Sequence, residues 1–436
     1  MIFDKLVNKS KMMYIMYCDN YLIQLIILSI IINITSALSV IDVITFFPNS
    51  FADVPSSLND NVIDYNPDVD LPAEDMIKRA GYSAEVHVVE TDDGYLLSLH
   101  RIPGKPGAKP IFLQHGLLGS SADWIIPGKG HSLAYLLSDV GYDVWLGNIR
   151  GNTYSRAHIN LSPHDSQFWN FSFHEMGIYD VPAAVSYIVE KTNMSLVYIG
   201  HSMGTTMGYV MASERPEIAE KIKVMISLAP IGFMSHLKSP VRIVAPFAND
   251  IKLVAHFLGV DEFLPQNIFI KYLAKYGCEL VTIEKEICKN SIFAISGFDD
   301  AQFNQTWLPV ILSHTPAGAS TKTMVHYAQE IVSGRFQQYD YGAKKNFELY
   351  NSTYPPEYNL SKIQVPIVFF YADNDWLAAP EDVQNLYSKL PRTYGLHRIN
   401  FTKFNHLDFL WGIDAKQLLY NDIIDLINKY DNLLLF

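Results

Sequence analysis

The sequence is poor in cysteine and in charged side chains. Its 436 residues include 3 cysteines, and charged residues make up 18% of the chain against 49% hydrophobic residues. So few cysteines exclude a small disulfide-dense scaffold, and so little charge excludes a chain that is mainly disordered. Basic residues are also scarce, because 33 lysines and arginines face 45 acidic residues and the net charge is −12. A surface that neutralises nucleic-acid phosphates is therefore not expected, and no nucleic-acid partner is predicted.

The sequence has only one long apolar run, at residues 22–34 (LIQLIILSIIINI), and Lys5, Lys9 and Lys11 precede it. The run is shorter than the about 20 residues that cross a bilayer. A basic start before a short apolar run, with small residues after it, is typical of a secretory signal peptide. We therefore predict a signal peptide over residues 1–39, with an uncleaved signal anchor as the alternative. A polytopic membrane protein is excluded.

Entry into the secretory pathway determines how the cysteines and several asparagines are interpreted. Removal of the signal takes away Cys18, and an oxidising compartment favours one disulfide between Cys278 and Cys288. Two free buried thiols are the alternative. The acceptor sequence for N-glycosylation occurs at seven positions after the signal, which favours an extracellular destination, with the lysosomal lumen as the alternative. The acceptors are Asn160, Asn170, Asn193, Asn304, Asn351, Asn359 and Asn400.

Short apolar strands alternate with helices after an irregular, Pro- and Asp-rich leader over residues 40–75. A β-hairpin is expected over residues 84–102, because both flanks of the turn at 92–94 alternate polar and apolar residues. Strand–helix alternation predicts an α/β fold with a mostly parallel sheet that helices cover on both faces. The expected strands cover residues 111–114, 142–146, 196–199, 223–228, 365–371 and 396–401, and the expected helices cover 131–140, 176–191, 203–214, a segment from 381 and 415–429.

The alternation stops near residue 229 and resumes near residue 365. We therefore predict a core in two parts, residues 76–231 and 358–436, with a mostly helical cap inserted over residues 232–357. The first part of this insertion has apolar residues at helical spacing from Leu237 to Leu258, interrupted by Pro240 and Pro246. Such a stripe fits core packing, and it also fits a lid that contacts lipid.

The sequence Gly200-His201-Ser202-Met203-Gly204 is a G-x-S-x-G motif between an expected strand and an expected helix. This context is the one in which the motif forms a nucleophile elbow, a sharp turn that exposes the serine hydroxyl above the sheet. Glycines allow neighbouring backbone to pass closely, and the helix N-terminus supplies N–H groups to a developing oxyanion. Ser202 is therefore the predicted nucleophile, and an idle serine in a tight turn is the alternative.

A catalytic serine needs a base and an acid that orients the base, and in this type of fold they follow in the order serine, acid, histidine. Asp373 and Asp375 both follow the expected strand 365–371 and are both candidates for the acid. His406 lies in a loop beyond the last expected strand and is the predicted base, with His397 as the alternative.

The second oxyanion donor is expected in the loop after an early strand. The segment Gln114-His115-Gly116-Leu117 follows the strand at 111–114. Gly116 permits a close turn that directs the backbone N–H of Leu117 toward the site, and the N–H of Met203, next to the nucleophile, is the other expected donor. The alternative for the loop at residues 114–117 is a simple glycine turn.

Long motifs in a fixed order resemble the acid lipases, the family of gastric, lingual and lysosomal acid lipases and their insect relatives. The resemblance covers about residues 64–430 and implies an α/β-hydrolase core with a helical cap. It also implies hydrolysis of acylglycerols and, in some members, of cholesteryl esters. The motifs are LQHGLLGSSADW (113–124), GYDVWLGNIRGNTYS (141–155), FWNFSFHEMGIYDVPA (168–183), GHSMGTT (200–206), GFDDAQFN (297–304) and FNHLDFLWG (404–412).

The resemblance assigns roles to individual residues of this chain. Ser202 and His406 correspond to the family's nucleophile and base, and the segment NDWLA (374–378) favours Asp375 over Asp373 as the acid. The positions of Leu117 and Met203 correspond to the oxyanion-hole amides, and Cys278 and Cys288 resemble the family's cap disulfide, although with wider spacing. This chain departs from gastric and lysosomal relatives in having Met203 instead of glutamine and Ser296 instead of a free cysteine.

The sequence thus predicts a secreted or lumenal serine ester hydrolase that needs no cofactor and no metal. Its expected partner is a neutral lipid, an acylglycerol or sterol ester, which it meets at a lipid–water interface through the cap. Two alternatives remain: a catalytically silent lipid-binding protein, and a short-chain esterase or acyltransferase on the same fold.

Overall fold

The computed structural model describes residues 66–249, 261–265, 290 and 292–433. Its main sheet has the strand order β1-β2-β4-β3-β6-β7-β10-β11, and the short strand β5 pairs with β2 outside this path. Within these residues, no helix combines the length and the apolar composition that membrane spanning requires. The strands are β1 (Glu85–Glu90), β2 (Tyr95–Ile102), β3 (Pro110–Gln114), β4 (Asp143–Leu146), β5 (Ala157–His158), β6 (Leu196–His201), β7 (Ile222–Leu228), β10 (Ile367–Tyr371) and β11 (Thr393–Arg398).

The sheet is parallel from β4 to β11, and β1 and β2 form an antiparallel hairpin at one edge. Every residue of β3, β4, β6 and β10 is buried. Strands that are covered on both faces read as continuous apolar runs, which is why these segments lack alternation in the sequence. At the edge, β1 alternates exposed and less exposed residues instead.

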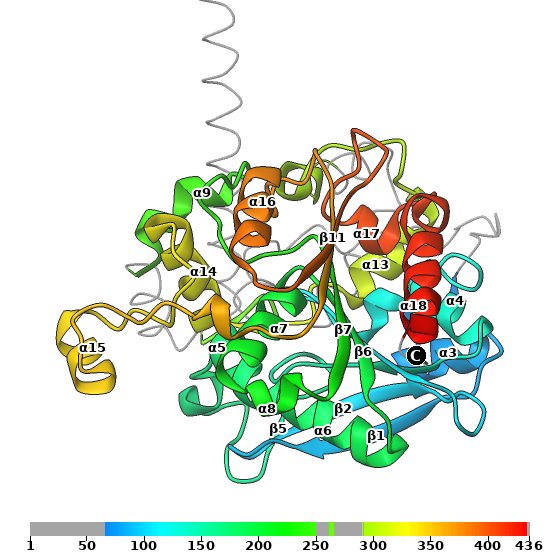
Figure 1. Ribbon diagram of the computed structural model, residues 1–436, viewed down its shortest axis with the longest axis horizontal. Coiled ribbons are helices and arrows are strands. Elements are labelled where there is room, and N and C mark those ends of the chain that lie inside the picture. Colours follow the sequence, from blue (N-terminus) through cyan, green and yellow to red (C-terminus); the bar gives the residue numbers. More distant parts are fainter. Residues whose placement is uncertain (1–65, 250–260, 266–289, 291, 434–436) are drawn as a thin grey trace, which may run out of the picture. The chain divides into compact units, whose positions relative to one another are not determined.

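Helices follow most of the parallel strands, and two of them pack closely on the sheet. Helix α6 packs against β1, β3 and β6, and α7 packs against β6 and β7 (Figure 1). The core helices are α3 (Ala73–Arg79), α4 (Leu133–Asp139), α5 (Phe173–Glu175), α6 (Val181–Thr192), α7 (Met203–Glu214), α8 (Pro216–Ala219), α16 (Pro380–Lys389), α17 (Asp408–Trp411) and α18 (Asn421–Leu433), with the 3₁₀ turns η1 (Pro67–Val69), η2 (Ser121–Trp124), η3 (Ser166–Trp169) and η8 (Leu360–Lys362) and the π-helical turns η4 (Met176–Asp180) and η9 (Lys416–Tyr420).

Parallel strand register brings the carboxyl ends of four strands, β3, β6, β7 and β10, next to one another. Gln114 at the end of β3 pairs with Gly200 of β6, and His201 pairs with Leu228 at the end of β7. Phe370 of β10 pairs with the same Leu228. The loops that follow β3, β6 and β10 therefore emerge next to one another, at the carboxyl ends of the strands where open α/β sheets bind their ligands.

The described part of the segment between β7 and β10 contains short helices and a two-stranded antiparallel sheet of β8 and β9. The expected apolar helix from Leu237 is broken at its prolines into α9 and the 3₁₀ turn η5, which leave Ile243 and Phe247 exposed. Helices α9 and α14 lie side by side (Figure 1). The elements are α9 (Val241–Val244), η5 (Ala245–Phe247), β8 (Glu262–Phe263), η7 (Gln305–Trp307), α13 (Leu308–His314), β9 (Ala319–Ser320), α14 (Thr321–Ser333) and α15 (Ala343–Tyr350).

Several predicted features lie outside the described residues: the signal peptide, the leader up to residue 65, and Cys278 and Cys288. Where the leader prediction can be compared, helix α3 already begins at Ala73. The last strand also differs from its prediction, because β11 covers Thr393–Arg398 rather than 396–401. This strand lies at the sheet edge and has few apolar residues, so hydrophobicity located it inaccurately.

Candidate active site

Ser202 lies in a strained turn between β6 and α7. Its backbone angles are φ 54° and ψ −120°, a combination that residues other than glycine rarely adopt. The motif glycines allow this turn: a Cβ on Gly204 would lie 2.3 Å from the carbonyl oxygen of Gln114, and a Cβ on Gly200 would lie 2.7 Å from the backbone of Gly204. The sequence therefore needs glycine at both positions for β6 and α7 to meet at the serine.

Hydrogen bonds on both sides hold the Ser202 backbone in this conformation. Its N–H donates to the Leu228 carbonyl at the end of β7 over 3.0 Å. Its own carbonyl accepts from the Thr205 N–H over 2.8 Å and from the Thr205 hydroxyl over 2.6 Å. Thr205 was not identified from the sequence, and no sequence signal distinguishes it from other threonines in a helix.

The structure brings Ser202, His406 and Asp375 together in one chain of hydrogen bonds. His406 Nε2 lies 2.8 Å from Ser202 Oγ, and His406 Nδ1 lies 2.8 and 3.0 Å from the two carboxylate oxygens of Asp375. Because a carboxylate can only accept, Nδ1 carries the proton and Nε2 is left to accept from the serine hydroxyl. All three residues are buried: Ser202 is 7% exposed, His406 is 3% exposed and Asp375 is 1% exposed.

Asp375 is held in place by the loop that follows β10. Its Oδ1 accepts the backbone N–H of Leu377 over 2.9 Å and that of Ala378 over 2.7 Å. These two hydrogen bonds hold the carboxylate where it contacts the imidazole of His406.

The alternative acid and base lie elsewhere and contact other groups. Asp373 is an ion-pair partner of Arg398 on the protein surface, through hydrogen bonds from Nε of 2.9 Å to each oxygen. His397 lies within β11 and stacks on Phe370 with ring centroids 4.7 Å apart. Neither residue hydrogen bonds to Ser202 in the structure.

The loop after β3 lies directly against the nucleophile. A Cβ on Gly116 would be 3.0 Å from the Ser202 Cβ, so only glycine allows this approach without displacement. Leu117 is the next residue, and Met203 is the first residue of α7. Among the described residues, no hydrogen-bond acceptor is found for the backbone N–H of Leu117 or of Met203. Both groups are thus free to donate to an oxygen above Ser202.

His201, the residue before the nucleophile, connects the nucleophile turn to the histidine loop. Its Nε2 donates to the backbone carbonyl of His406 over 2.9 Å. Complete burial lowers the pKa of His201 well below its ordinary value, so the ring is neutral. Its Nδ1 is buried without a hydrogen-bond partner among the described residues. This role could not be predicted from the sequence, because the bond joins segments that are 205 residues apart.

The described residues contain no group of three or more histidine, cysteine or acidic side chains arranged to hold a metal ion. The seven glycosylation acceptors all reach the surface: Asn304 is partly buried and the other six are exposed. Asn193 and Asn351 adopt left-handed backbone at the ends of α6 and α15.

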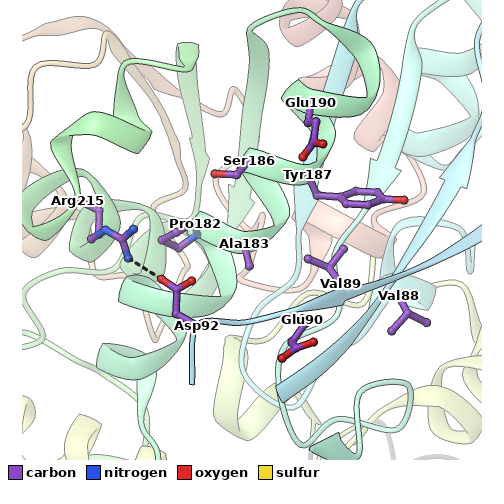
Figure 2. Close-up of a pocket in the computed structure, with 10 residues that line it drawn as sticks. All are labelled: Val88, Val89, Glu90, Asp92, Pro182, Ala183, Ser186, Tyr187, Glu190 and Arg215. Atoms are coloured by element: carbon purple, nitrogen blue, oxygen red, sulfur yellow. Dashed lines mark ion pairs between the residues drawn. The ribbon is translucent and has the colours of Figure 1, made fainter. Parts of the chain in front are cut away.

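A pocket of about 310 Å³ lies between β1 and α6, away from these loops (Figure 2). An ion pair of 3.6 Å joins Asp92 and Arg215 at this pocket. The carboxylates of Glu90 and Glu190 also line it. Because charged groups are costly to bury against hydrocarbon, this lining is unsuited to a fatty acyl chain, and the pocket is not part of the candidate site.

Comparison with known proteins agrees with the geometry. Residues 73–128 match a family model for a partial alpha/beta-hydrolase lipase region, and residues 109–252 match the alpha/beta hydrolase fold. Gastric triacylglycerol lipase of Bos taurus is 42% identical over 83% of this chain and 92% of its own length. Lysosomal acid lipase/cholesteryl ester hydrolase of Homo sapiens is 39% identical over 84% and 92%, and Lipase 3 of Drosophila melanogaster is 41% identical over 81% and 92%. With the α/β-hydrolase fold and this similarity over most of its length, the chain belongs to the acid lipase family.

Proposed function

We propose that this protein is a secreted or lumenal lipase that hydrolyses acylglycerols and sterol esters through an acyl-enzyme on Ser202. One observation carries the proposal: the hydrogen-bonded sequence Asp375, His406, Ser202 at a strained turn. Serine, histidine and a carboxylate in this geometry activate the hydroxyl as a nucleophile. An inactive lipid-binding relative would have no use for this strain and alignment.

In the first half of the reaction, Ser202 Oγ attacks the ester carbonyl carbon while His406 Nε2 takes the hydroxyl proton. Asp375 accepts from Nδ1 and stabilises the imidazolium that forms. The C–O bond to the alcohol then breaks, and His406 returns its proton to the leaving alcohol oxygen. In the second half, a water molecule attacks the acyl-enzyme with the same base, which releases the fatty acid and restores Ser202.

The negative charge on the carbonyl oxygen of the tetrahedral intermediate needs donors that are in place beforehand. The backbone N–H groups of Leu117 and Met203 fill this role, supported by the close approach of Gly116 to Ser202. Removing one such donor costs roughly 10²–10³ in rate in comparable hydrolases. Because Met203 acts through its backbone, its difference from glutamine leaves the donor intact, and its side chain is buried.

A neutral lipid substrate follows from the relatives, whose names specify triacylglycerol and cholesteryl esters. The exposed apolar side chains of Ile243 and Phe247 on α9 and η5 support contact with a lipid surface through the inserted cap. The secretory route rests on the predicted signal peptide and on the surface positions of the glycosylation acceptors. In that compartment Cys278 and Cys288 are proposed to form a disulfide.

The decisive experiment compares the purified protein with its Ser202→Ala variant on emulsified long-chain triacylglycerol, on cholesteryl oleate and on a soluble acetyl ester. We expect the variant to lose roughly 10⁶-fold in kcat, the loss seen when a nucleophile is removed from such a triad. A serine-reactive alkyl phosphonate should label the unaltered protein and not the variant.

The substrate series separates the alternatives. Turnover of the acetyl ester alone would show a short-chain esterase, and the lipase assignment would then be wrong. If the unaltered protein neither reacts with the phosphonate nor cleaves any ester, a silent lipid-binding protein is the correct description.

A further inference from the structure

A segment of the insertion, residues 296–302, joins the two loops that carry the acid and the base. The Ser296 carbonyl accepts the N–H of Trp376 over 3.3 Å and the N–H of His406 over 3.4 Å. The side-chain amide of Asn405 donates to the Gly297 carbonyl over 2.9 Å. One short stretch of backbone thus contacts the loop of Asp375 and the loop of His406 simultaneously.

Asn374 strengthens the same junction. Its amide donates to the carbonyl of Phe298 over 3.0 Å and to that of Lys403 over 2.7 Å. Gly297 has φ 113°, and a Cβ there would lie 2.2 Å from the Asn374 carbonyl oxygen. Glycine is therefore required for the segment to approach this closely. These contacts fix residues 296–302 against both loops.

Two buried carboxyl groups meet at this junction, Asp299 from the segment and Asp408 from the start of α17. They are 1% and 5% exposed, respectively. Asp299 Oδ1 accepts the Ala301 N–H over 2.9 Å, and Asp408 Oδ2 accepts the Asn405 N–H over 2.7 Å. The carboxyl groups of Asp299 and Asp408 lie close enough to act on each other's titration.

A hydrogen bond between two carboxyl groups requires a proton on one of them, because carboxylates only accept. No N–H or O–H donor of the described residues reaches Asp299 Oδ2. Burial is the main cause that raises the pKa of both groups, well above the ordinary value in Asp408. The pair therefore keeps one proton at a pH where an exposed aspartate has none.

Nearby charged groups increase the difference in pKa between Asp408 and Asp299. The carboxylate of Asp375 acts on Asp408 and raises its pKa further, and Lys403 acts on Asp299 in the opposite direction. Tyr420 also faces Asp408, but its hydroxyl donates to the carbonyls of Phe409 and Leu410 and it is neutral. Loss of the shared proton would thus leave Asp299 and Asp408 both charged close to the carboxylate of Asp375.

We propose that Asp299 and Asp408 are positioning residues whose shared proton holds the loop from Asn405 to Asp408, and with it His406, in line with Asp375 and Ser202. This inference rests on the proposed function. As the pH rises the pair loses its proton, the two carboxylates repel, and the histidine loop loosens. Hydrolysis then falls on the alkaline side for a reason separate from the titration of the catalytic histidine.

The test replaces the titrating proton with a permanent donor. In Asp299→Asn the amide donates to Asp408 at every pH while its oxygen still accepts from Ala301, and Asp408→Asn provides the reciprocal arrangement. We expect the alkaline limb of the kcat profile to move upward by at least about one pH unit in both variants, because the group that titrates has been removed. KM should change little. In Asp299→Leu, which leaves Asp408 without its partner, kcat should fall by roughly 10–100-fold at every pH, as for a misplaced catalytic group.

Asp373→Asn is the matched control, because it neutralises a partly exposed aspartate near the same loop, and its profile should superimpose on that of the unaltered protein. If Asp299→Asn and Asp408→Asn also superimpose, or lower kcat without changing the shape of the profile, the shared proton has no role and the proposal is wrong. Urea unfolding as a function of pH gives a readout independent of activity. The unaltered protein should lose stability as the pH rises through the titration of the pair, and the two asparagine variants should lose less. Absence of ester hydrolysis would therefore overturn the proposed function and still test the pair.

Discussion

Ser202 illustrates how single residues of this protein depend on their neighbours. Its positive φ costs about 1–3 kcal/mol, and such a conformation persists only where the surroundings impose it. Here the Leu228 carbonyl on one side and Thr205 on the other fix the peptide groups that flank the serine. The strain directs Oγ toward His406 rather than into the sheet.

Exchange of an aspartate for asparagine separates the two candidate acids at the residue scale. In Asp375→Asn the side chain can donate to Nδ1, which stabilises the wrong imidazole tautomer, and we expect kcat to fall by about 10⁴-fold. Asp373→Asn loses only an exposed ion pair with Arg398, worth about 0–1 kcal/mol, and should remain within about threefold of the unaltered protein. Initial rates on one emulsified ester measure the effects of both substitutions. A greater loss from Asp373→Asn would show that the acid has been wrongly identified.

Site residues could be predicted where the motif specifies the chemistry, as for Ser202 and His406. Spacing alone did not separate Asp373 from Asp375, since both follow β10 at turn positions, and only the resemblance favoured the second. Thr205 and His201 could not be found at all. Their roles consist of hydrogen bonds to backbone carbonyls, and every side chain of those types could make such bonds in a suitable fold.

At the scale of elements, buried parallel strands were predicted most closely. The strand expected at 111–114 is β3 (Pro110–Gln114), and the helix expected at 203–214 is α7 with the same bounds. The helix expected at 176–191 instead begins with the π-helical turn η4, whose last residue, Asp180, is buried and pairs with Arg150 over 2.6 Å. Hydrophobic periodicity did not show this turn, because η4 is a single turn and is too short for a separate period to be recognised.

The segment of α9 and η5 presents apolar side chains to solvent, in contrast to a stripe that packs in a core. Ile243 is 65% exposed and Phe247 is 59% exposed. We expect Ile243→Ser with Phe247→Ser to lower kcat/KM on emulsified triacylglycerol by roughly 10-fold or more, because each lost apolar contact with lipid is worth about 1–2 kcal/mol. Hydrolysis of a soluble acetyl ester should be unchanged, because these side chains lie outside the catalytic contacts.

Val140→Ser is a suitable control for this pair of substitutions. Val140 is 53% exposed at the end of α4. This helix packs on the main sheet and lies outside the segment between β7 and β10. Loss of emulsion activity in this control, or equal losses on emulsion and soluble ester in the double variant, would contradict lipid contact through α9 and η5.

For the whole molecule, buried histidines and buried carboxyl groups determine how the free energy of unfolding depends on pH. Burial lowers the pKa of His100 and His115 to about 4 and that of His326 to about 3. Burial raises the pKa of Asp123 to about 7. Further buried groups shift in both directions: His174 and His201 downward, and Asp408 and Glu330 upward.

The sign of each contribution follows from which state binds more protons. Between about pH 6.5 and about pH 4 the unfolded chain protonates His100, His115 and His326 and the folded chain does not, so these groups favour unfolding as the pH falls. Asp123 acts oppositely, because the folded chain keeps its proton up to about pH 7 and this stabilisation is lost as the pH rises. The acids Asp180, Asp299, Asp408 and Glu330, whose pKa burial also raises, act as Asp123 does, and His174 and His201 act as the other three histidines do. Five buried histidines therefore oppose five buried acids across this range.

The contribution of one histidine can be isolated from this balance by measuring the free energy of unfolding in urea, followed by tryptophan fluorescence, between about pH 6.5 and about pH 4.5. We expect the slope of this free energy against pH to decrease when a buried histidine is removed. His100→Asn should reduce this slope by up to about 1.4 kcal/mol per unit, because it removes one proton from the difference between the states. Its amide can still bond to the Ser121 hydroxyl, which lies 2.7 Å from His100 Nδ1. His164→Asn, at an exposed histidine, should leave the slope unchanged. A slope in His100→Asn equal to that of the unaltered protein would show that burial does not keep His100 neutral in the folded state, and would contradict the prediction.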